Sequence, residues 1–397
     1  MTPPALLPPR DADAHARVLL LHNRYRAAGG EERVVDELEA LLRARGHAVA
    51  RLERDSEEAG RVQAAAGLLR GGLQPGDVAK AVRLHHADVV HAHNVHPLLG
   101  WRALAAARAA GARTVLHLHN YRLVCAIGVA YRDGGPCYEC HGRDTLPGVR
   151  HRCRGSLSEA AVYAAGLARQ QPRLLAHADA LVSVSEALAA RLGALGIPRD
   201  SMTVLPNAVR SIAEGSRAAE GAYALAAGRL VEEKGFDVAI QAARDAGVPL
   251  RIAGAGPDEA RLRALAAGAD VTFLGRLSDD ALAHERRGAA VLLAPARSDD
   301  PCPMTVIEAL ADGLPVLGSD RGGLRELVGE DAALPVDDPA VWNAALTALW
   351  SDPAARAAAG AAALARARIR HSPDAWYAGL MGVYDGAQAS CAGKGAI

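Results

Sequence analysis

A buried strand that opens into a charged, glycine-flanked loop restricts the choice of folds more than any other segment. Apolar residues run from Tyr223 to Ala227, and the chain continues as Gly228-Arg229-Leu230-Val231-Glu232-Glu233-Lys234-Gly235. Such an apolar run indicates a buried strand. Because ligands of open α/β sheets bind at the carboxyl ends of the strands, Arg229 and Lys234 are predicted to face a ligand. Two fixed cations suit a diphosphate.

A second charged segment, Asp300 to Glu308, crosses the entry to a predicted helix. Val306, Ile307 and Leu310 make this helix largely apolar, so an acid on it is expected to be buried and to need partners. The plainer alternatives are a helix-capping role for Asp300 and a surface position for Glu308. Carboxylates accept hydrogen bonds from hydroxyl groups, so the cations and the acids together indicate a nucleotide-sugar as the ligand.

The length and the order of elements predict two α/β domains. A chain of 397 residues exceeds one ordinary domain. In the first half, apolar runs alternate with helical segments at 31–45 and 101–110, which is typical of a parallel sheet. The predicted strands of this half are 17–22, 47–52, 88–93, 114–119, 181–185 and 203–205.

The second half repeats this alternation, with predicted strands at 223–227, 250–253, 271–274, 291–294 and 315–318. Pro206-Asn207-Ala208 separates the halves, which places the domains at 1–207 and 208–372. The final segment, 373–397, carries Trp376, Tyr377 and Tyr384 near one helical face. We expect this helix to pack back on the first domain and to end in a tail.

Composition excludes several classes of partner. Lys and Arg together number 45, as do Asp and Glu, so the net charge is zero and no nucleic-acid partner is expected. The N-terminal segment lacks the apolar core of a signal peptide, and no apolar run reaches the roughly 18 residues of a spanning helix. We expect a cytoplasmic protein, and a peripheral contact with the inner face of the membrane is compatible with the sequence.

Paired glycines separate the first predicted strand from the first predicted helix, in the run Gly29-Gly30-Glu31-Glu32. Glycines let backbone N–H groups approach a phosphate closely, and the positive end of the helix dipole favours the anion. A simple glycine turn, followed by acids that stabilise the start of the helix, is the alternative.

Taken together, these segments resemble the retaining glycosyltransferases of family 4. That resemblance covers residues 17–384 and implies the B-type (GT-B) architecture, two facing Rossmann-like domains with a nucleotide-sugar cleft between them. It rests on the order and spacing of segments that are each weak alone: Gly29-Gly30, His91-Ala92-His93-Asn94, residues 114–120, Ser183-Val184-Ser185-Glu186, Pro206-Asn207, Gly228-Arg229 with Lys234-Gly235, Ala253-Gly254-Ala255-Gly256-Pro257, and 300–308 with Gly313-Leu314-Pro315-Val316.

The resemblance also implies roles for the matching residues. The donor-binding residues would be Gly29, Gly30, Arg229, Lys234, Gly275, Asp300 and Glu308, and the catalytic residues His119, Arg229, Lys234 and Asp300. In that pattern Arg229 and Lys234 hold the diphosphate, and Glu308 holds the ribose hydroxyls. The residues around Gly275 frame the base, and His119 contacts the transferred sugar.

The implied reaction is a metal-independent transfer of a hexosyl unit, with retention, from a UDP- or GDP-sugar to an unknown acceptor hydroxyl in glycan, polysaccharide or glycolipid assembly. Two departures from the family pattern keep the donor open. Asp300 stands where the family usually has Glu. Cys302-Pro303-Met304 replaces a Phe-Gly-Leu-type loop whose amides meet the sugar, and Pro303 has no amide hydrogen.

Two other classes of function remain open at this point. A nucleotide-sugar 2-epimerase also has two facing Rossmann-like domains, but it would need dedicated acid–base residues at the sugar. A catalytically idle nucleotide-sugar-binding module is compatible with the departures at Asp300 and Pro303. Incubation with nucleotide-sugars alone separates them, because an epimerase converts its donor without an acceptor and an idle module releases no nucleotide.

Four of the six cysteines, Cys125, Cys137, Cys140 and Cys153, fall in the segment after the predicted strand 114–119. That segment is rich in Gly, Arg and Pro and can bury little core by itself. The C-x₂-C spacing allows a structural zinc site, in which His141 or His151 could replace one ligand. Ordinary reduced thiols and a disulfide are the alternatives.

Histidines recur around the third predicted strand, at His85, His86, His91, His93 and His96. Alternation along a strand puts His91 and His93 on one face. We interpret them as residues that line the cleft rather than as metal ligands, because nothing else in the sequence supports a metal there.

Overall fold

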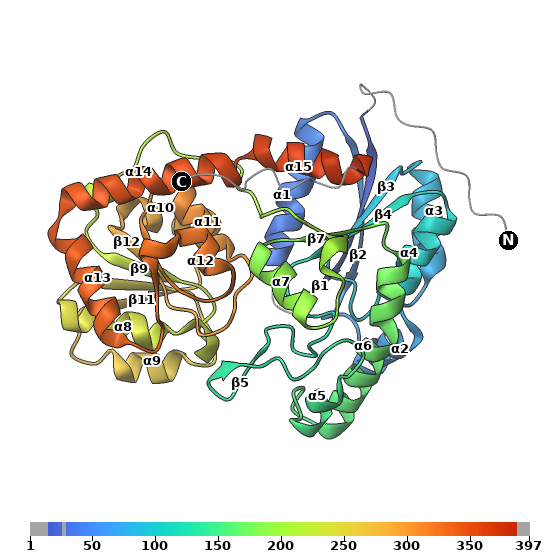
Figure 1. Ribbon diagram of the computed structural model, residues 1–397, viewed down its shortest axis with the longest axis horizontal. Coiled ribbons are helices and arrows are strands. Elements are labelled where there is room, and N and C mark those ends of the chain that lie inside the picture. The colour runs from blue at the N-terminus through green and yellow to red at the C-terminus, as the bar shows by residue number, and fades with distance from the viewer. Residues whose placement is uncertain (1–14, 26–28, 387–397) are drawn as a thin grey trace.

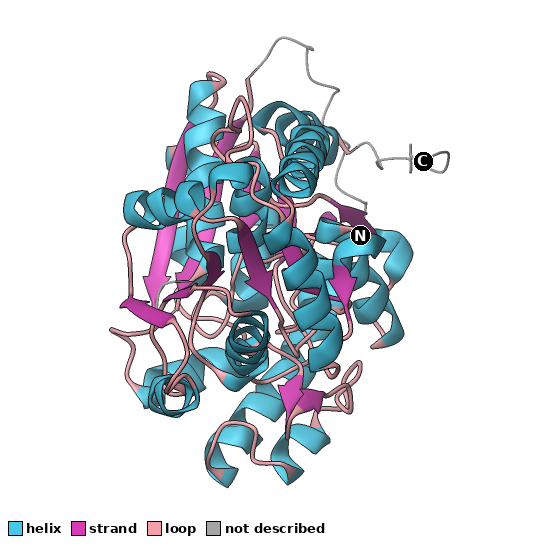
Figure 2. Cartoon of the chain, turned by 90° about the vertical axis from the view of Figure 1, so that its left-hand side faces the viewer, coloured by secondary structure: helices cyan, strands magenta, loops and turns pink. Residues whose placement is uncertain are grey.

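The structure, a computed structural model, contains two α/β domains that lie side by side (Figure 1). It describes residues 15–25 and 29–386, so the expected tail and residues 1–14 lie outside the described part of the chain. Each domain is built on a six-stranded parallel sheet, as the alternation of apolar runs and helices predicts. Helices cover both sides of the strands (Figure 2), which explains why the strands are apolar on successive residues.

The N-terminal domain has the strand order β2-β1-β3-β4-β7-β8. Its strands are β1 (Arg17–Arg24), β2 (Ala48–Asp55), β3 (Val89–Ala92), β4 (Arg113–Leu118), β7 (Ala180–Ser183) and β8 (Met202–Val204). Its helices are α1 (Gly30–Ala44), α2 (Arg61–Arg70), α3 (Pro75–Leu84), α4 (Gly100–Ala109), α5 (Leu146–Arg150), α6 (Leu157–His177) and α7 (Glu186–Ala194). A short antiparallel hairpin, β5 (Tyr131–Arg132) with β6 (Gly135–Pro136), stands apart from the sheet.

The sequence prediction omits helices α2, α3, α5, α6 and α7, and for α2 and α6 the structure shows the physical reason. Helix α2 buries only Gly67 and Leu68, so it shows no apolar stripe that would reveal a helix. Helix α6 contains Pro172 in its interior, a residue that normally ends a helix. It also buries the polar side chains of Gln170 and Gln171, which hides the face that packs on α2.

The C-terminal domain has the strand order β11-β10-β9-β12-β13-β14. Its strands are β9 (Ala224–Ala227), β10 (Leu250–Ala253), β11 (Val271–Gly275), β12 (Val291–Ala294), β13 (Val316–Ser319) and β14 (Ala333–Leu334). Its helices are α8 (Phe236–Ala246), α9 (Glu259–Leu265), α10 (Asp279–Gly288), α11 (Met304–Ala311), α12 (Gly322–Val328), α13 (Pro339–Ser351) and α14 (Pro353–Arg370).

The last helix, α15 (Pro373–Asp385), returns to the N-terminal domain. The hydroxyl of Tyr377 lies 2.8 Å from Nε2 of His47, and the hydroxyl of Tyr384 lies 2.9 Å from Nδ1 of His91. Trp376, on the same helix, is buried. Helices α14 and α15 run in succession along one side of both domains (Figure 1), so the aromatic residues of α15 attach the end of the described chain to the first domain.

The topology defines where each sheet can bind a ligand. In the N-terminal sheet β1 lies between β2 and β3, and in the C-terminal sheet β9 lies between β10 and β12. The chain order reverses at these places, and ligands of open α/β sheets bind beside such switch points at the carboxyl ends of the strands. The loops that follow β1, β3, β9 and β12 are therefore the candidate ligand-binding loops.

Candidate functional site

The loops after β9 and β12 touch each other, and a glycine makes the contact possible. Gly235 has a φ of +67°, and a Cβ atom at this position would lie 1.9 Å from the carbonyl oxygen of Pro295, so no other residue fits. The amides of Arg297 and Ser298 both donate to the carbonyl of Glu233, at 2.8 and 3.2 Å. This contact brings the Lys234 end of the first loop beside the start of the second.

The contact pairs the two motifs that the sequence analysis singled out. Lys234 Nζ and the Asp300 carboxylate form an ion pair, with 29% and 15% of their side chains exposed. Asp300 is held in place because its carbonyl accepts a 2.9 Å hydrogen bond from the amide of Gly323. Arg229 is more exposed, at 59%, and its Nη2 lies 3.3 Å from Oε1 of Glu233. The structure thus brings Arg229, Lys234 and Asp300 to one end of the C-terminal sheet.

Glu308, on α11, lies between arginines from both domains. Its carboxylate pairs with Arg286 Nη1 at 2.8 Å and with Arg33 of helix α1, and 11% of its side chain is exposed. Arg33 also pairs with Asp279. The prediction that a buried acid at this position needs partners is therefore met. The sequence analysis missed Arg33, although its place in the first turn after Gly29-Gly30 could have marked it.

The paired glycines lie at the start of α1, opposite α11. A Cβ atom on Gly30 would lie 3.5 Å from Cγ of Met304, so Gly30 faces the start of α11 closely. The amide of Gly29 donates a 2.8 Å hydrogen bond to Oε2 of Glu32. A phosphate would therefore compete with a carboxylate for the Gly29 amide.

Glu32 itself is charged in this arrangement. Burial opposes its ionisation, but the His22 ring, whose Nε2 lies 3.6 Å from Oε1, and hydrogen bonds from the amides of Tyr25 and Gly29 outweigh burial and lower the pKa of Glu32 to about 2. The glycine turn with a helix-capping acid, which the sequence left as an alternative, is thus present in the structure beside any phosphate-binding role.

His119, which directly follows β4, belongs to a column of four imidazoles that we call the histidine stack: His91, His93, His117 and His119. Neighbouring ring centroids in the stack lie 4.3–5.3 Å apart. His93 Nδ1 is 2.9 Å from His119 Nε2, and His91 Nε2 is 3.2 Å from His117 Nδ1. Alternate residues of the neighbouring strands β3 and β4 point to the same face, which explains the column.

Burial keeps the histidine stack neutral. Loss of hydration lowers the pKa of His119 and of His91 to about 3. The same cause, with the neighbouring imidazoles adding to it, takes the pKa of His93 and His117 well below the usual range. At physiological pH the stack therefore offers His119 as an uncharged hydrogen-bonding group at the strand end.

Ligating atoms of His91, His93 and His117 lie within 4.8 Å of one another, so their spacing alone would permit a metal ion. Neutral imidazoles are ordinary metal ligands, so the neutrality of these rings does not decide the matter. His91 bonds to His117 and to Tyr384, so both of its ring nitrogens already have partners. We therefore read the stack as a support for His119.

A cavity of about 30 Å³ lies beside His119 at the carboxyl ends of β3 and β4. Glu31, Asn120 and Arg122 contribute polar groups to its wall. Asn120 Nδ2 donates to Oε2 of Glu31 at 3.1 Å, and the Tyr25 hydroxyl donates to the same oxygen at 2.6 Å. This polar group in the N-terminal domain was not identified from the sequence.

The segment after His119 reaches the C-terminal domain. The Tyr121 hydroxyl donates a 3.1 Å hydrogen bond to the carbonyl of Asp299, and the Tyr138 hydroxyl bonds to the carboxylate of the same residue. The Tyr131 hydroxyl donates to Oε1 of Glu232 at 3.2 Å. Asp299 directly precedes Asp300, and Glu232 is two residues before Lys234. The segment that carries these tyrosines therefore meets both C-terminal loops at one place. The sequence analysis missed Asp299.

Gly275 ends β11 with a φ of +69°, and its carbonyl accepts a 2.7 Å hydrogen bond from the amide of Gly254. It therefore lies at the carboxyl edge of the same sheet, two strands from β9.

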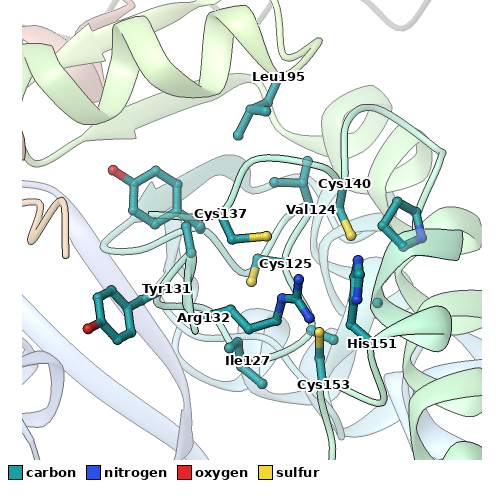
Figure 3. Close-up of a pocket in the computed structure, with 15 residues that line it drawn as sticks. Val124, Cys125, Ile127, Tyr131, Arg132, Cys137, Cys140, His151, Cys153 and Leu195 are labelled. Carbon is teal, nitrogen blue, oxygen red and sulfur yellow. The ribbon is translucent and has the colours of Figure 1, made fainter. Parts of the chain in front are cut away.

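Cys125, Cys137, Cys140 and Cys153 surround a separate cavity in the N-terminal domain (Figure 3). All four are free thiols in the structure.

No helix in the described part of the chain has the length and apolarity that a membrane span requires.

Sequence models of two protein families match the chain in succession. The model described as Glycosyltransferase Family 4 matches residues 28–211, and the model described as Glycosyl transferases group 1 matches residues 210–366. The two matches meet in the linker between the domains and together cover the strands of both sheets except β1.

Individual relatives are similar over shorter stretches. WcaL of Escherichia coli (strain K12), described as a colanic acid biosynthesis glycosyltransferase, is 29% identical over 177 residues, which are 40% of this chain and 44% of WcaL. A GDP-mannose-dependent alpha-mannosyltransferase of Mycolicibacterium smegmatis is 39% identical over 102 residues, 25% of this chain and 26% of that protein. The chain thus spans less than half the length of these relatives.

Solved structures share the fold over nearly the whole chain. Sucrose-phosphate synthase from Thermosynechococcus elongatus has a TM-score of 0.67 at 18% identity, covering 93% of this chain and 98% of that one. HepE of Anabaena, solved in complex with UDP, has a TM-score of 0.60 at 16% identity, with 92% and 99% covered. Their architecture is the GT-B arrangement that the resemblance implied.

Proposed function

The chain belongs to the group 1, family 4 glycosyltransferases, and from this premise we propose that it transfers a hexosyl unit, with retention, from a nucleoside diphosphate sugar to an acceptor hydroxyl of a growing glycan. In this reaction the bond between the anomeric carbon and the diphosphate oxygen breaks. A bond to the acceptor oxygen forms on the same face. The acceptor proton passes to the departing diphosphate.

The observation that carries this proposal is the ion pair between Lys234 and Asp300. It unites a cation suited to a diphosphate with an acid suited to a sugar hydroxyl, at the carboxyl end of a parallel sheet and beside its switch point. When the donor binds, Lys234 exchanges Asp300 for the diphosphate, and Asp300 becomes free to accept hydrogen bonds from the sugar. Each charge-assisted contact of this kind contributes roughly 1.5–3 kcal/mol.

Glu308 has the complementary task on the nucleoside. Its carboxylate is fixed from two sides by Arg286 and Arg33, which leaves it aligned to accept hydrogen bonds from the ribose hydroxyls. Because Arg33 belongs to α1, its ion pair with Glu308 connects a nucleoside bound at Glu308 to the helix that begins at Gly30. Residues after Gly275 would frame the base at the same sheet edge.

We propose that Arg229 and Lys234 stabilise the leaving diphosphate without a metal ion. Preorganised cations lower the energy of a transition state in which negative charge develops, and removal of one such group typically costs 10²–10³-fold in turnover. Across the site, His119 contacts the transferred sugar as a neutral imidazole. A neutral ring can exchange hydrogen bonds with hydroxyls while adding no repulsion to the positive charge that develops at the anomeric carbon.

The proposal is tested by nucleotide release and by product stereochemistry. Purified protein is incubated with UDP- and GDP-hexoses, first alone and then with a panel of hydroxyl acceptors, and the freed nucleoside diphosphate is measured. Nuclear magnetic resonance then assigns the anomeric configuration of the product. UDP is chosen because HepE was solved with it, and GDP because the M. smegmatis relative is GDP-mannose-dependent.

Acceptor-dependent release of the diphosphate and an α-linked product from an α-linked donor would support the proposal. Conversion of the donor in the absence of any acceptor would favour an epimerase instead. Release with an inverted linkage would contradict retention while leaving glycosyl transfer intact. The Lys234→Ala variant is the matched negative control. It removes the proposed diphosphate contact, and it keeps Gly235, whose conformation sets the shape of the loop.

A further inference from the structure

Four cysteines that the proposed reaction does not use come together in the N-terminal domain. Cys125 lies in the segment after β4, Cys137 and Cys140 follow the β5–β6 hairpin, and Cys153 lies between α5 and α6. Their sulfur atoms point into one shared space (Figure 3). The cavity there measures about 20 Å³, which is enough for one particle of the size of a water molecule or an ion.

The surrounding chain has little regular structure to hold it. Between the end of β4 and the start of α5, the described elements are β5 and β6, each of two residues. Backbone hydrogen bonds fix the turns that carry the thiols: Cys125 N–H donates to Tyr121 at 2.8 Å, Cys137 N–H to Ala130 at 2.7 Å, and Cys153 N–H to Gly148 at 3.0 Å. Each turn is thus defined by its own bonds, and the thiols of all of them line one cavity.

We propose that Cys125, Cys137, Cys140 and Cys153 bind one zinc ion as thiolates, in a structural site that fixes the β5–β6 hairpin. The C-x₂-C pair and two further cysteines are the ligand set that zinc takes in tetrahedral structural sites. Binding releases the thiol protons to solvent, and the binding free energy becomes folding free energy of this segment.

Metal binding requires the sulfur atoms to draw together. In the described chain no three of them meet the 4.8 Å spacing that the nitrogen atoms of the histidine stack show. Tetrahedral zinc, with bonds of about 2.3 Å, sets sulfur atoms about 3.8 Å apart. Because the thiols lie on turns rather than on helices or sheet strands, small rotations of their side chains and turns achieve this contraction.

The cavity wall supplies groups that suit a zinc–thiolate cluster. The guanidinium of Arg132 reaches the same space (Figure 3), and its Nη1 pairs with Asp133 at 3.0 Å. A cluster of one dication and four thiolates has a net charge of −2, and a neighbouring arginine offsets one unit of it. His151 also lines the cavity, but its Nε2 lies 2.9 Å from Oε2 of Glu139. We therefore assign the fourth ligand position to cysteine and not to His151.

The position of the hairpin gives the metal a role in the site, and this step rests on the proposed function. Tyr131 begins the hairpin and contacts Glu232, while Tyr138 lies between the two cysteines of the C-x₂-C pair and contacts Asp299. These partners belong to the loops that carry Lys234 and Asp300. A metal that fixes both tyrosines therefore fixes the contact between the N-terminal domain and the donor loops.

The metal itself is measured first. Full-length protein, produced with zinc in the medium and purified without chelator, is analysed for elements, and about one zinc per chain is expected. The apoprotein is then titrated with Co²⁺, which should produce intense sulfur-to-cobalt charge-transfer bands and the visible bands of tetrahedral cobalt. Absence of zinc, together with an apoprotein that gives no tetrahedral cobalt spectrum, would overturn the proposal. A mass decrease that reveals disulfides in the native protein would overturn it equally.

Variants locate the site. The double variant Cys137→Ser/Cys140→Ser should lose the zinc, whereas Cys391→Ser, a cysteine outside the quartet, should retain it. His151→Asn should keep the four-thiolate cobalt spectrum, and loss of that spectrum would refute the all-cysteine assignment. If the double variant fails to fold, the cobalt titration of the unaltered chain still decides the question.

Hydrogen exchange then tests the link to the hairpin. Removal of the metal should raise exchange by at least tenfold in residues 125–153 while β9 and β10 stay protected. Equal exchange rates in residues 125–153 with and without the metal would refute the structural role. None of these readouts requires donor binding or turnover, so a failure of the metal site and a failure of the glycosyltransferase proposal can be told apart.

Discussion

The two sides of the candidate site differ in how they manage charge. On the C-terminal side the charged groups form pairs: Lys234 with Asp300, Arg229 with Glu233, and Glu308 with Arg286. On the N-terminal side, the ends of β3 and β4 present imidazoles that burial keeps neutral. A charged ligand must therefore exchange partners on one side, whereas on the other it meets neutral imidazoles that have no ion pair to give up.

This difference separates the tasks of the two domains. Paired charges can be released by a diphosphate and restored when it leaves, so the C-terminal side is suited to bind and discharge an anion. A stack of neutral rings has no such exchange to make, and its geometry is set by the pairing of two strands. The four predictions that follow test whether charge on one side and burial on the other are the real controls.

Lowering the pH should reduce the free energy of unfolding, and it should affect the domain with the histidine stack most. The folded pKa values in the histidine stack lie below the unfolded value of about 6.5, so the unfolded chain takes up protons first as the pH falls. Stability is complete above about pH 6.5 and declines as the pH falls toward the folded values near 3. Between pH 7 and 5.5, His91 and His119 should each cost about 1 kcal/mol, and His93 and His117 should add to the loss in the same direction.

Urea denaturation over this pH range measures the loss, and hydrogen exchange assigns it to a domain. Amides of β3 and β4 should lose protection before those of β9 and β10. The exposed His85, changed to Gln, serves as the control and should leave the pH dependence as it was. A decline shared equally by both domains would contradict the comparison.

Lys234→Ala tests the charged side directly. Turnover should fall by about 10²-fold or more, equivalent to about 2.7 kcal/mol of lost transition-state stabilisation, because the leaving diphosphate loses a preorganised cation. Steady-state assays of nucleotide release measure the change in kcat. Lys80→Ala removes an exposed lysine from helix α3 and should have no effect. Equal turnover in both variants would remove Lys234 from the mechanism.

Asp300→Asn and Glu308→Gln should separate sugar from nucleotide. Asp300→Asn frees Lys234 from its carboxylate, so affinity for the free nucleoside diphosphate should stay within about twofold or rise, while transfer falls by at least tenfold. Glu308→Gln should weaken nucleotide binding about tenfold, close to 1.4 kcal/mol, through the ribose hydroxyls. Calorimetry with the free nucleoside diphosphate distinguishes them. Equal losses of affinity would mean that the two roles are misassigned.

Tyr384→Phe tests the neutral side through stability rather than through activity. It leaves Nδ1 of the buried His91 without its partner, which should lower the unfolding free energy by about 1–3 kcal/mol. Tyr377→Phe removes a similar bond from a half-buried hydroxyl and should cost less than about 1 kcal/mol. Denaturation of the two variants in parallel makes the measurement. A larger loss from Tyr377→Phe would show that burial does not govern this region.

The sequence predicts the sheets well because their strands are unbroken apolar runs. Strand β10 was predicted with the bounds that the structure has, Leu250–Ala253, and β12 likewise with Val291–Ala294. It predicts the surroundings of Lys234 because glycine and a strand end are local signals. Helix α6 was missed because Pro172 lies in its interior and the buried Gln170 and Gln171 interrupt its apolar face, although Ser156 caps its start.

Contacts between distant segments were beyond the reach of local patterns. Arg33 and Glu308 are 275 positions apart, and no local pattern in either segment predicts that they form an ion pair. The histidine stack was half visible: alternation put His91 and His93 on one face, but the register of β3 with β4 was needed to add His117 and His119. The imidazoles of the stack are neutral because they are buried, and the depth of their burial could not be predicted from the sequence.

The return of α15 has a consequence for how the two domains can move. The chain crosses between them twice, after β8 and again between α14 and α15, and the crossings are bonded together. Val209 N–H donates to the carbonyl of His371 at 3.1 Å, and His371 Nδ1 donates to the carbonyl of Asn207 at 2.7 Å. One crossing would let the domains twist and slide freely. Two joined crossings favour rotation about an axis that passes near them.

Displacement in such a rotation grows with distance from the axis. The crossings lie along the side that α14 and α15 follow, and the β5–β6 hairpin lies toward the opposite side (Figure 1). For any small angle, the bonds from Tyr131 and Tyr138 to the C-terminal domain therefore lengthen more than contacts near His371. The hairpin contact therefore acts far from the axis, where a given bonding force exerts a larger torque on the angle between the domains than it would beside His371.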